Sequence, residues 1–561
     1  MVRDNIEAAI KEALASLGAL HVPFVVERPA EMEHGDYATN AALAAAKILK
    51  KNPRDVAEQL KEKLVSQLPS TEDSVGVSAQ QVSLSAIKKI EVAGVGFINF
   101  TLAGTVVKKI VHEAHEAEWG SNILYKGKTV MVEYTDPNPF KEFHIGHLMS
   151  NAIGESIARV LEFSGANVIR ANYQGDVGLH VAKAIWGKQQ KPDASWGEAY
   201  AYGSAEYEAN KEEIDAINKK VYEKDPSVIA LYDEGRKHSL ETFEKIYKTL
   251  GTKFDTYFFE SETWQKGLAL VQTNVGKVFE ESDGAVIYRG EQDGLHTRVF
   301  VNKAGLPTYE AKDLGLLMLK KEIGTIDLSI TITASEQQEY LKVVLAAAKH
   351  IAEVADIAQK TKHITHGMMR FAEGKMSSRT GNVITGESLL NDLQAEAKEK
   401  MQGRELEDSE KTAEHIAVGG IKYSVLKQAS GKDIVFDPAK SLSLEGDSGP
   451  YVQYALVRAR AVLRKASEAE AVDAESAEPS PLERLLVHFP EVVERAASEL
   501  EPHYVVTYIT ELAADFNSWY ASERFIIDGK VSKHTVAAVK AVENTLARGL
   551  QVLGIPAPEE M

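Results

Sequence analysis

The sequence predicts a multidomain α/β protein whose C-terminal region is all-α, and three observations carry that prediction. First, the chain has 561 residues, 44% hydrophobic and 26% charged, which is typical of a globular protein with several domains. Second, residues 129–132 read as a buried strand, apolar residues recur at helical spacing over 148–161, and residues 166–172 read as another strand. Such a strand–turn–helix–strand unit begins a Rossmann-type parallel sheet. Third, the chain beyond residue 390 carries mainly helical patterns.

These patterns divide the chain into three expected domains. Residues 1–115 mix helical and strand patterns and form an additional α/β domain. Residues 125–390 form the parallel-sheet domain, with a helical insertion at about 187–255 that is rich in Lys, Glu, Tyr and Asp. Residues 391–561 form a helical domain.

Composition excludes several classes of site. The chain contains no cysteine, which excludes disulfides, thiolate zinc sites and cysteine nucleophiles and fits a cytosolic protein. The first residues carry an acid and no apolar core, so they do not read as a signal peptide, and no apolar run approaches the length of a membrane span. We therefore expect a cytoplasmic protein without a membrane partner. The net charge of −18 argues against indiscriminate nucleic-acid binding, but a local basic patch can still bind a nucleic acid.

The turn His144-Ile145-Gly146-His147 lies at the junction between the first predicted strand and the helix that follows it. Ligands of open α/β sheets bind at the carboxyl ends of the strands, and a helix N-terminus favours anionic phosphate. Gly146 lets a ligand approach the backbone closely, and both histidines can donate hydrogen bonds to a polyphosphate whose charge grows in the transition state. The alternative is a simple helix start with two half-buried histidines.

A second motif, Gly374-Lys375-Met376-Ser377-Ser378-Arg379-Thr380-Gly381, has a glycine at each end and predicts a mobile loop. Lys375 and Arg379 are cations that can clamp a phosphate chain, and the two serines add hydrogen-bond donors. Taken alone, the motif fits an ordinary solvated basic loop better. The histidine turn upstream makes that alternative a minor one.

The pair of motifs resembles the two signatures of class I aminoacyl-tRNA synthetases, and the flanking residues resemble those of arginyl-tRNA synthetases in particular. The resemblance rests on these segments: Val132-Glu133-Tyr134, Pro137-Asn138, Lys141 with the histidine turn, Gly175-Asp176, Gly35 to Asn40, Gly96 to Phe100, Gly449 to Ala455, and Leu553-Gly554-Ile555. Because they cover essentially the whole chain in order, the resemblance is more specific than either motif alone.

Membership of this family implies a two-step, ATP-dependent ligation of L-arginine to tRNA(Arg) through an arginyl-adenylate. ATP is expected to bring Mg2+ with it, so no dedicated metal site in the protein is expected. The resemblance makes the N-terminal domain a tRNA-binding domain and the C-terminal helical domain an anticodon-binding domain, and we expect a monomer. Both reaction steps depend on electrostatics and positioning more than on covalent catalysis.

The resemblance also implies which residues bind the phosphates of ATP and catalyse the reaction. Catalysis is assigned to His144, His147, Lys141 and Lys375. Lys141 lies just upstream of the histidines. In family members whose second signature motif is incomplete, a lysine at this place takes over the role of that motif. ATP binding is assigned to both histidines, Gly146, Met376, Ser377, Ser378 and Arg379.

A guanidinium group needs planar carboxylates and an aromatic wall, and Tyr309 with Asp313, four residues apart on one helix face, supplies such a pair. The resemblance assigns these residues to arginine: Glu133, Asp136, Asn138, Glu260, Tyr309, Asp313 and Gln337, the last with its register open among residues 336–338. Asp136 stands where a small hydroxyl residue is usual. The alternative interpretation for each acid is a charge on the surface of a helix. This alternative is weak for Asp313 and stronger for Glu260.

Aromatic and polar residues of the terminal domains are the candidates for tRNA binding: Phe97, Asn99, Phe100, Tyr451, Tyr454, Arg458 and Trp519. The first three can stack on and read an unpaired base, although at least two of them are expected to be core strand residues. The two tyrosines can form a stacking face beside the arginine, and packing tyrosines are an equal alternative. The tryptophan lies near the segment whose aromatic residue contacts the anticodon in the family.

Three other functions compete with this interpretation. A nucleotidyltransferase acting on a small acid or alcohol can also use a His-x-Gly-His turn, but it leaves the two terminal domains without a role. A non-catalytic tRNA-binding relative would be favoured by loss of His144, His147 or Lys375, and all three are present. A synthetase for another amino acid is the nearest rival, and cysteine specificity would need zinc ligands built without cysteine.

Overall fold

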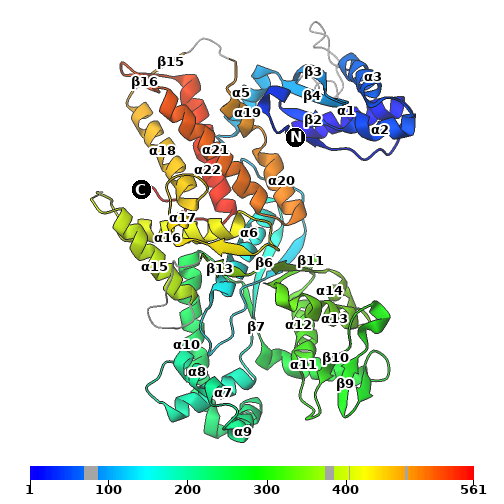
Figure 1. Cartoon of the computed structure of the whole chain (residues 1–561), viewed down its shortest axis with the longest axis vertical. Coiled ribbons are helices and arrows are strands. Elements are labelled where there is room, and N and C mark those ends of the chain that lie inside the picture. The colour runs from blue at the N-terminus through cyan, green and yellow to red at the C-terminus, as the bar shows by residue number, and fades with distance from the viewer. Residues whose placement is uncertain (68–85, 373–384, 404, 474–477) are drawn as a thin grey trace. The chain divides into compact units, whose positions relative to one another are not determined.

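The computed structural model describes residues 1–67, 86–372, 385–403, 405–473 and 478–561 (Figure 1). These residues form two compact units. The first unit comprises residues 1–120, 458–492 and 511–546, and the second comprises residues 121–457, 493–510 and 547–561. The C-terminal helices therefore contribute residues to both units. None of the described helices is long and apolar enough to cross a membrane.

A five-stranded sheet with the order β12-β11-β5-β6-β7 forms the centre of the second unit, and all its strand pairs are parallel. Its strands are β5 (Thr129–Glu133), β6 (Asn167–Gln174), β7 (Thr256–Phe259), β11 (Leu328–Ala334) and β12 (Thr361–His366). Val132 of β5 pairs with Ile330 on one side and with Arg170 on the other. This confirms the predicted parallel sheet, and the buried apolar run of β5 fits a parallel strand whose two faces are both covered.

Helices connect the strands of this sheet. They are α6 (Ile145–Phe163), α11 (Glu260–Thr273), α12 (Tyr309–Ile323), α13 (Gln338–Lys349) and α14 (Ala355–Gln359), with the short η3 (Ser335–Gln337) before α13. The core between sheet and helices includes Met131, Phe258, Leu314 and Val344. The helix α6 follows β5 directly, so its N-terminus lies at the carboxyl end of that strand.

Two further segments are inserted between strands of the sheet. The predicted helical insertion comprises α7 (Leu179–Gln190), α8 (Trp196–Ala205), α9 (Lys211–Glu223) and α10 (Pro226–Leu250), drawn in teal in Figure 1. A small antiparallel sheet follows, with β8 (Glu280–Ser282), β9 (Ala285–Tyr288), η2 (Gly290–Asp293) and β10 (Arg298–Val301). Asp283 and Gly284, with φ of 50° and 77°, turn the chain between β8 and β9 as two-residue hairpins require.

The remaining elements of the second unit lie C-terminal to the sheet. They are β13 (Met369–Phe371), α15 (Gly386–Lys400), α16 (Ser409–Leu426), β14 (Ile434–Phe436), α17 (Pro438–Ser441) and the first half of α18 (Gly449–Ser467). A buried lysine of α16, Lys422, donates to the carbonyl oxygens of Leu250 and Gly554 at 2.6 and 2.7 Å. It thereby joins the C-terminal end of α10 to the chain that follows the last helix.

The first unit contains an antiparallel sheet with the order β1-β2-β4-β3 and the distal C-terminal helices. Its N-terminal elements are α1 (Val2–Ser16), β1 (Val26–Glu27), η1 (Met32–His34), β2 (Tyr37–Thr39), α2 (Ala41–Leu49), α3 (Pro53–Ser66), β3 (Ile87–Ala93), β4 (Phe97–Leu102) and α5 (Gly104–Glu113). Its C-terminal elements are β15 (Glu470–Val472), α19 (Pro481–Leu486), β16 (Ile526–Ile527) and β17 (Lys530–Ser532). The helices α20 (Phe489–Glu499), α21 (His503–Ser522) and α22 (Lys533–Val552) have residues in both units.

The motif Gly35-Asp36-Tyr37 holds the parts of the first unit together. Asp36 is buried and accepts the backbone N–H of Leu102 at 2.6 Å, and it pairs with Arg484 of α19 at 2.7 Å. The hydroxyl of Tyr37 donates to Glu491 at 2.7 Å. These bonds give the motif a structural role that its local pattern does not reveal.

Candidate active site

The N-terminus of α6 carries the histidine turn, and backbone N–H groups determine the tautomer of both rings. His144 is the N-cap, and its Nδ1 accepts the N–H of Gly146 at 3.1 Å. The Nδ1 of His147 accepts the N–H of His144 at 3.1 Å, and the two rings stack with centroids 3.6 Å apart. Because Nδ1 is an acceptor in both rings, a neutral ring must carry its proton on Nε2. Each histidine therefore offers an N–H donor at Nε2.

Both histidines remain neutral at physiological pH. Burial lowers the pKa of His147 well below its ordinary value, and the nearby His144 and Lys141 lower it further. Burial and then Lys141 also lower the pKa of His144. Gly146 is needed for this arrangement, because a Cβ there would lie 2.9 Å from Cε1 of His144. The helix start thus presents neutral donors beside its own N–H groups, an arrangement suited to an anion.

A cavity of about 580 Å³ opens beside the histidine turn, at the carboxyl ends of β5, β6 and β11. Most of the predicted side chains line it: Glu133, Asp136, Asn138, His144, Gly146, His147, Glu260, Tyr309, Asp313 and Gln337. The structure thereby brings residues from the predicted phosphate side and the predicted arginine side into one cavity. Their sequence positions span most of the sheet-forming part of the chain.

Carboxyl groups outnumber ammonium groups at this cavity. Five carboxyl side chains line it: Glu133, Asp136, Glu260, Asp313 and the exposed Glu336. Two buried lysines of α12 pair with two of them, Lys320 with Glu133 at 3.0 Å and Lys312 with Glu260 at 2.6 Å. Three carboxyl groups are therefore left without an ammonium partner among the described residues, and the cavity favours a ligand that carries positive charge.

Asp313 has a tyrosine instead of a lysine as its partner. Its Oδ2 accepts the hydroxyl of Tyr340 at 2.6 Å. Burial raises the pKa of Asp313 to about 7; the charges of Glu133 and Glu260 add to the rise, whereas the bond from Tyr340 and the charge of Lys320 oppose it. A cation beside this carboxyl group would favour its ionised form and lower that pKa.

Glu260 is the first residue of α11 and is only 5% exposed, so the helix-surface interpretation of this residue is wrong. Burial raises its pKa, although the bond to Lys312 opposes the rise. Gly175 allows Glu260 and Asn138 to approach each other closely. A Cβ on Gly175 would lie 2.3 Å from Oδ1 of Asn138 and 3.2 Å from Oε1 of Glu260. A larger residue at position 175 would push these two side chains away.

Asp136 lies in a strained loop and holds the backbone of the neighbouring strand. Thr135 and Asp136 both have positive φ, 79° and 45°, which side chains rarely adopt and which concentrates at functional sites. The Oδ1 of Asp136 accepts the N–H of Tyr173 at 2.7 Å. Burial and the charge of Glu133 raise the pKa of Asp136 well above its ordinary value. The sequence showed the unusual acid but not this bond.

Three predicted residues lie at the edge of this region. Tyr309 is 60% exposed at the start of α12, with its ring centre 5.1 Å from Nζ of Lys312. Gln337 is exposed on η3, and Glu336 beside it also lines the cavity. Lys141 is half-buried, and its Nζ lies 5.2 Å from the ring centre of Tyr200 in α8.

The second predicted motif lies outside the residues that the structure describes. This concerns Lys375, Met376, Ser377, Ser378 and Arg379.

Two of the three candidates on β4 are buried. Phe100 is completely buried and Asn99 is 9% exposed, whereas Phe97 is 41% exposed. Phe100 therefore belongs to the core, which corrects the expectation that its ring can stack on a base. Phe97 and Phe100 are three positions apart and therefore point to opposite faces of the sheet, which explains why only one of the two rings is buried.

The C-terminal candidates make contacts of their own. In the first unit, Nη1 of Arg458 donates to Asn517 at 2.6 Å, and its guanidinium carbon lies 4.7 Å from the ring centre of Tyr520. In the same unit, Nε1 of Trp519 donates to Glu523 at 2.8 Å. In the second unit, Tyr451 and Tyr454 are half-buried on α18.

Sequence reasoning missed the lining residues Arg298, Lys320 and Tyr340, and it missed Lys312, which pairs with the lining Glu260. Lys320 had a detectable signal. It follows Asp313 by seven positions in an apolar stretch, which places both on one helix face. Tyr340 had no local signal, since its partner Asp313 lies on another helix.

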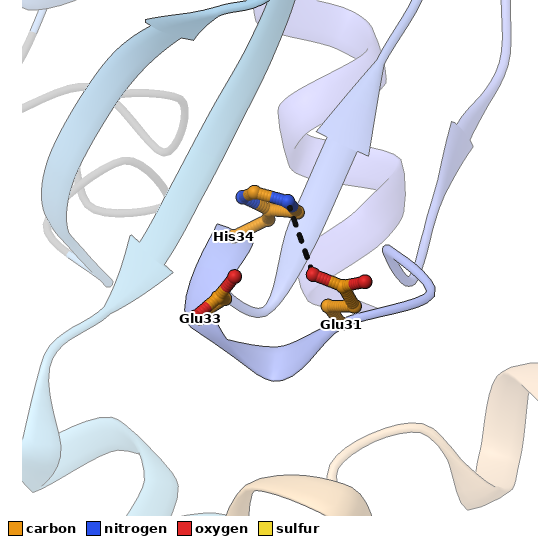
Figure 2. A group of neighbouring side chains, drawn as sticks. All are labelled: Glu31, Glu33 and His34. Carbon is orange, nitrogen blue, oxygen red and sulfur yellow. Dashed lines mark ion pairs between the residues drawn. The ribbon is translucent and has the colours of Figure 1, made fainter.

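One group of possible metal ligands occurs among the described residues, at η1 in the first unit. Glu31, Glu33 and His34 are all exposed, and Nε2 of His34 lies 3.6 Å from Glu31 (Figure 2). Exposed acidic groups of this kind are common without a metal, and no buried polar group supports binding here. The group carries no metal assignment.

Three family models match consecutive parts of the chain. The model for the catalytic domain of class I (R) tRNA synthetases matches residues 110–438, the arginyl tRNA synthetase N-terminal domain matches residues 4–102, and the DALR anticodon binding domain matches residues 452–561.

Curated and solved relatives agree with these models. An arginine–tRNA ligase of Clostridium kluyveri is 31% identical over 96% of both chains, and one of Clostridium perfringens is 29% identical over the same shares. The structure of Thermus thermophilus arginyl-tRNA synthetase matches with a TM-score of 0.80 and 26% identity, and both chains are covered completely. The Plasmodium falciparum arginyl-tRNA synthetase has the same fold, with a TM-score of 0.79 at 19% identity over 100% of this chain and 99% of that one.

Proposed function

This chain belongs to the arginyl-tRNA synthetase family of class I, and from that membership we propose which of its residues carry the reaction. The family ligates arginine to tRNA(Arg) in two steps. The arginine carboxylate attacks the α-phosphate of ATP, which gives arginyl-adenylate and diphosphate. The terminal ribose hydroxyl of the tRNA then attacks the adenylate carbonyl, and AMP leaves. Mg2+ enters with ATP as part of the substrate complex.

The observation that carries the proposal is the charge pattern of the single cavity. Neutral N–H donors of His144 and His147 lie at one end, and the other end holds three carboxyl groups more than ammonium groups among the described residues. Free arginine has two cationic groups, the α-ammonium and the guanidinium, and one carboxylate, which must reach the α-phosphate of ATP. The charge pattern of the cavity therefore supports arginine as the ligand, with its carboxylate toward the phosphates.

At the arginine end, we assign the guanidinium to Asp313 and Glu260 with the ring of Tyr309 as a wall. Lys312 already neutralises part of the charge of Glu260, so Asp313 supplies the main uncompensated charge. Glu133 and Asn138 bind the α-ammonium end of arginine, and Gln337 completes the rim of the cavity. Asp136 acts mainly through Tyr173, whose backbone it holds, and adds negative potential near the ammonium.

At the phosphate end, the two Nε2–H groups and the N-terminus of α6 stabilise the charge that grows on the α-phosphate. The donors are neutral and held by backbone bonds, so they need little reorganisation as the bond to arginine forms. Gly146 keeps the approach open. Lys141 adds a cation close enough to lower the pKa of both histidines. Lys375, Met376, Ser377, Ser378 and Arg379 complete the ATP site.

We further propose three domains for this function: residues 1–115 bind tRNA, residues 125–390 catalyse, and residues 391–561 bind the anticodon. The exposed Phe97 is the preferred contact on the first domain. On the helical domain, Tyr451, Tyr454, Arg458 and Trp519 remain the proposed contacts. We propose a cytoplasmic monomer. A salt titration of tRNA affinity tests the tRNA contacts, because phosphate contacts predict a steep loss of affinity with added salt.

The test of the proposed function is ATP–diphosphate exchange with each of the twenty amino acids, run with and without tRNA. Exchange with arginine alone supports the assigned pocket. Exchange with a different amino acid keeps the fold and refutes the pocket. Absence of exchange under every condition refutes the catalytic assignment.

A further inference from the structure

We propose that Tyr340 is a positioning residue for Asp313, and that its hydroxyl orients the carboxylate that binds the guanidinium of arginine. This inference rests on the arginine role of Asp313 proposed above. Tyr340 lies on the first turn of α13, 27 residues beyond Asp313, and its hydroxyl donates to Oδ2 of Asp313 at 2.6 Å. Both side chains line the cavity.

The bond restricts the carboxylate in two ways. It holds Oδ2, so rotation of the carboxylate about its bond to Cβ breaks a short hydrogen bond. It also occupies one acceptor position of Oδ2 and leaves those of Oδ1 for a ligand. A guanidinium group is planar and binds best when the carboxylate plane is already set, so an orienting bond raises affinity without touching the reacting atoms.

The ring of Tyr340 is itself contacted by Arg298 of β10. The guanidinium carbon of Arg298 lies 5.3 Å from the ring centre, within the range of a cation–π contact. Its Nη1 pairs with Glu310 at 3.0 Å, and its Nε donates to Nε2 of His296 at 2.9 Å. Because Glu310 balances its charge, Arg298 can hold the ring without repelling a cationic ligand.

The hydrogen bond from Tyr340 also favours ionisation of Asp313, which the neighbouring acids disfavour. The charged and titratable groups that face Asp313 come from five elements and one loop: Glu133 of β5, Asp136, Tyr173 of β6, Glu260 of α11, Lys320 of α12 and Tyr340 of α13. Three of these are acids, which disfavour a further negative charge. The bond from Tyr340 and the charge of Lys320 are the two influences that favour the ionised carboxylate.

The test is Tyr340→Phe in the full chain, assayed by arginine-dependent ATP–diphosphate exchange with tRNA present. A hydrogen bond to a charged group predicts a rise of roughly 10-fold to 100-fold in the KM for arginine, with kcat and the KM for ATP nearly unchanged. The pH at which arginine affinity is half-maximal should also move upward, because the bond favours ionisation of Asp313.

The matched control is Tyr207→Phe, which removes a comparable hydroxyl bond, to Asp215 at 3.0 Å, in the helical insertion. It should leave both Michaelis constants unchanged. An unchanged KM for arginine in Tyr340→Phe, or an equal rise in both constants without a shift in the pH profile, overturns the inference. The proposed function is judged separately, by exchange of the parent chain with arginine and by Asp313→Asn. If these behave as proposed while Tyr340→Phe does not, only the role of Tyr340 is refuted.

Discussion

The two ends of the cavity are built in different ways. At the phosphate end, four consecutive residues at one helix N-terminus hold each other through backbone bonds. At the arginine end, side chains meet from distant parts of the chain, as in the pairs Asp313–Tyr340 and Glu260–Lys312, which are 27 and 52 residues apart. The difference predicts a division of labour. Variants of the local end should change the rate of activation, and variants of the assembled end should change the affinity for arginine.

The largest effect is expected for His147→Ala. The substitution removes an Nε2–H donor from the phosphate end and the acceptor that holds the N–H of His144. Loss of one such preorganised donor lowers kcat by about 100-fold to 1000-fold, and the KM for arginine should stay close to that of the parent chain. Exchange kinetics measure both. His350→Ala, a half-exposed histidine paired with Asp293, is the control. An arginine KM that rises as much as kcat falls would contradict the division of labour.

The next effect is expected for Asp313→Asn, which keeps the shape of the side chain and removes its charge. Truncation of a buried charge partner weakens binding by about 3 kcal/mol, which corresponds to a rise of about 100-fold in the KM for arginine. The KM for ATP should not change, since the phosphate end is untouched. Exchange kinetics at saturating ATP provide the measurement. If the arginine KM stays unchanged, the guanidinium lies elsewhere in the cavity.

The same contrast explains how much of the molecule the sequence could reveal. The parallel sheet and the histidine turn depend on local pattern, so the strands β5 and β6 and the start of α6 were predicted close to their observed bounds. Asp313 was found because Tyr309 precedes it by one helical turn. Local pattern is enough wherever neighbours in sequence are also neighbours in space.

The assembled end could not be predicted in the same way. Lys312 and Tyr340 make their contacts through the packing of α12 against α11 and α13, and no local signal shows which distant residue each will meet. For Glu260, a surface charge remained a serious alternative to the predicted arginine contact, because its burial depends on that packing. At least two of Phe97, Asn99 and Phe100 were expected in the core, but which of them are buried depends on the packing of β4, which the local sequence does not show.

The pH dependence of ligand affinity should also distinguish the two ends, with a smaller effect than the two substitutions above. The pKa of Asp313 is raised to about 7, so its carboxyl group is protonated in much of the free protein below that pH. Arginine binds the ionised form, and its affinity should fall as pH falls through 7, by about 10-fold at pH 6. The histidines have lowered pKa values, so ATP affinity should gain nothing from their protonation over this range.

Calorimetry in two buffers of different ionisation enthalpy measures the proton that arginine releases from Asp313 near pH 6.5. Asp313→Asn should abolish most of that release. Proton release that is unchanged in this variant would assign the titration to another carboxyl group of the cavity, with Asp136 and Glu260 as the candidates, because burial raises the pKa of both.

The smallest effect is expected for Gly146→Ala, and it tests whether the phosphate end depends on shape as well as on donors. The new Cβ would lie 2.9 Å from Cε1 and 3.0 Å from Nδ1 of His144, so the ring must turn away from its bond to the N–H of residue 146. We expect kcat to fall by about 3-fold to 10-fold, the cost of a misplaced rather than missing donor. Alanine is favoured over glycine inside a helix, so the melting temperature should stay the same or rise. Gly431→Ala, where the nearest atom to a Cβ is the carbonyl oxygen of Thr365 at 4.0 Å, is the matched control and should leave kcat unchanged. A lower kcat with an undiminished melting temperature can come only from the position of the His144 ring, whereas an unchanged kcat would mean that His147 alone supplies the donor that matters.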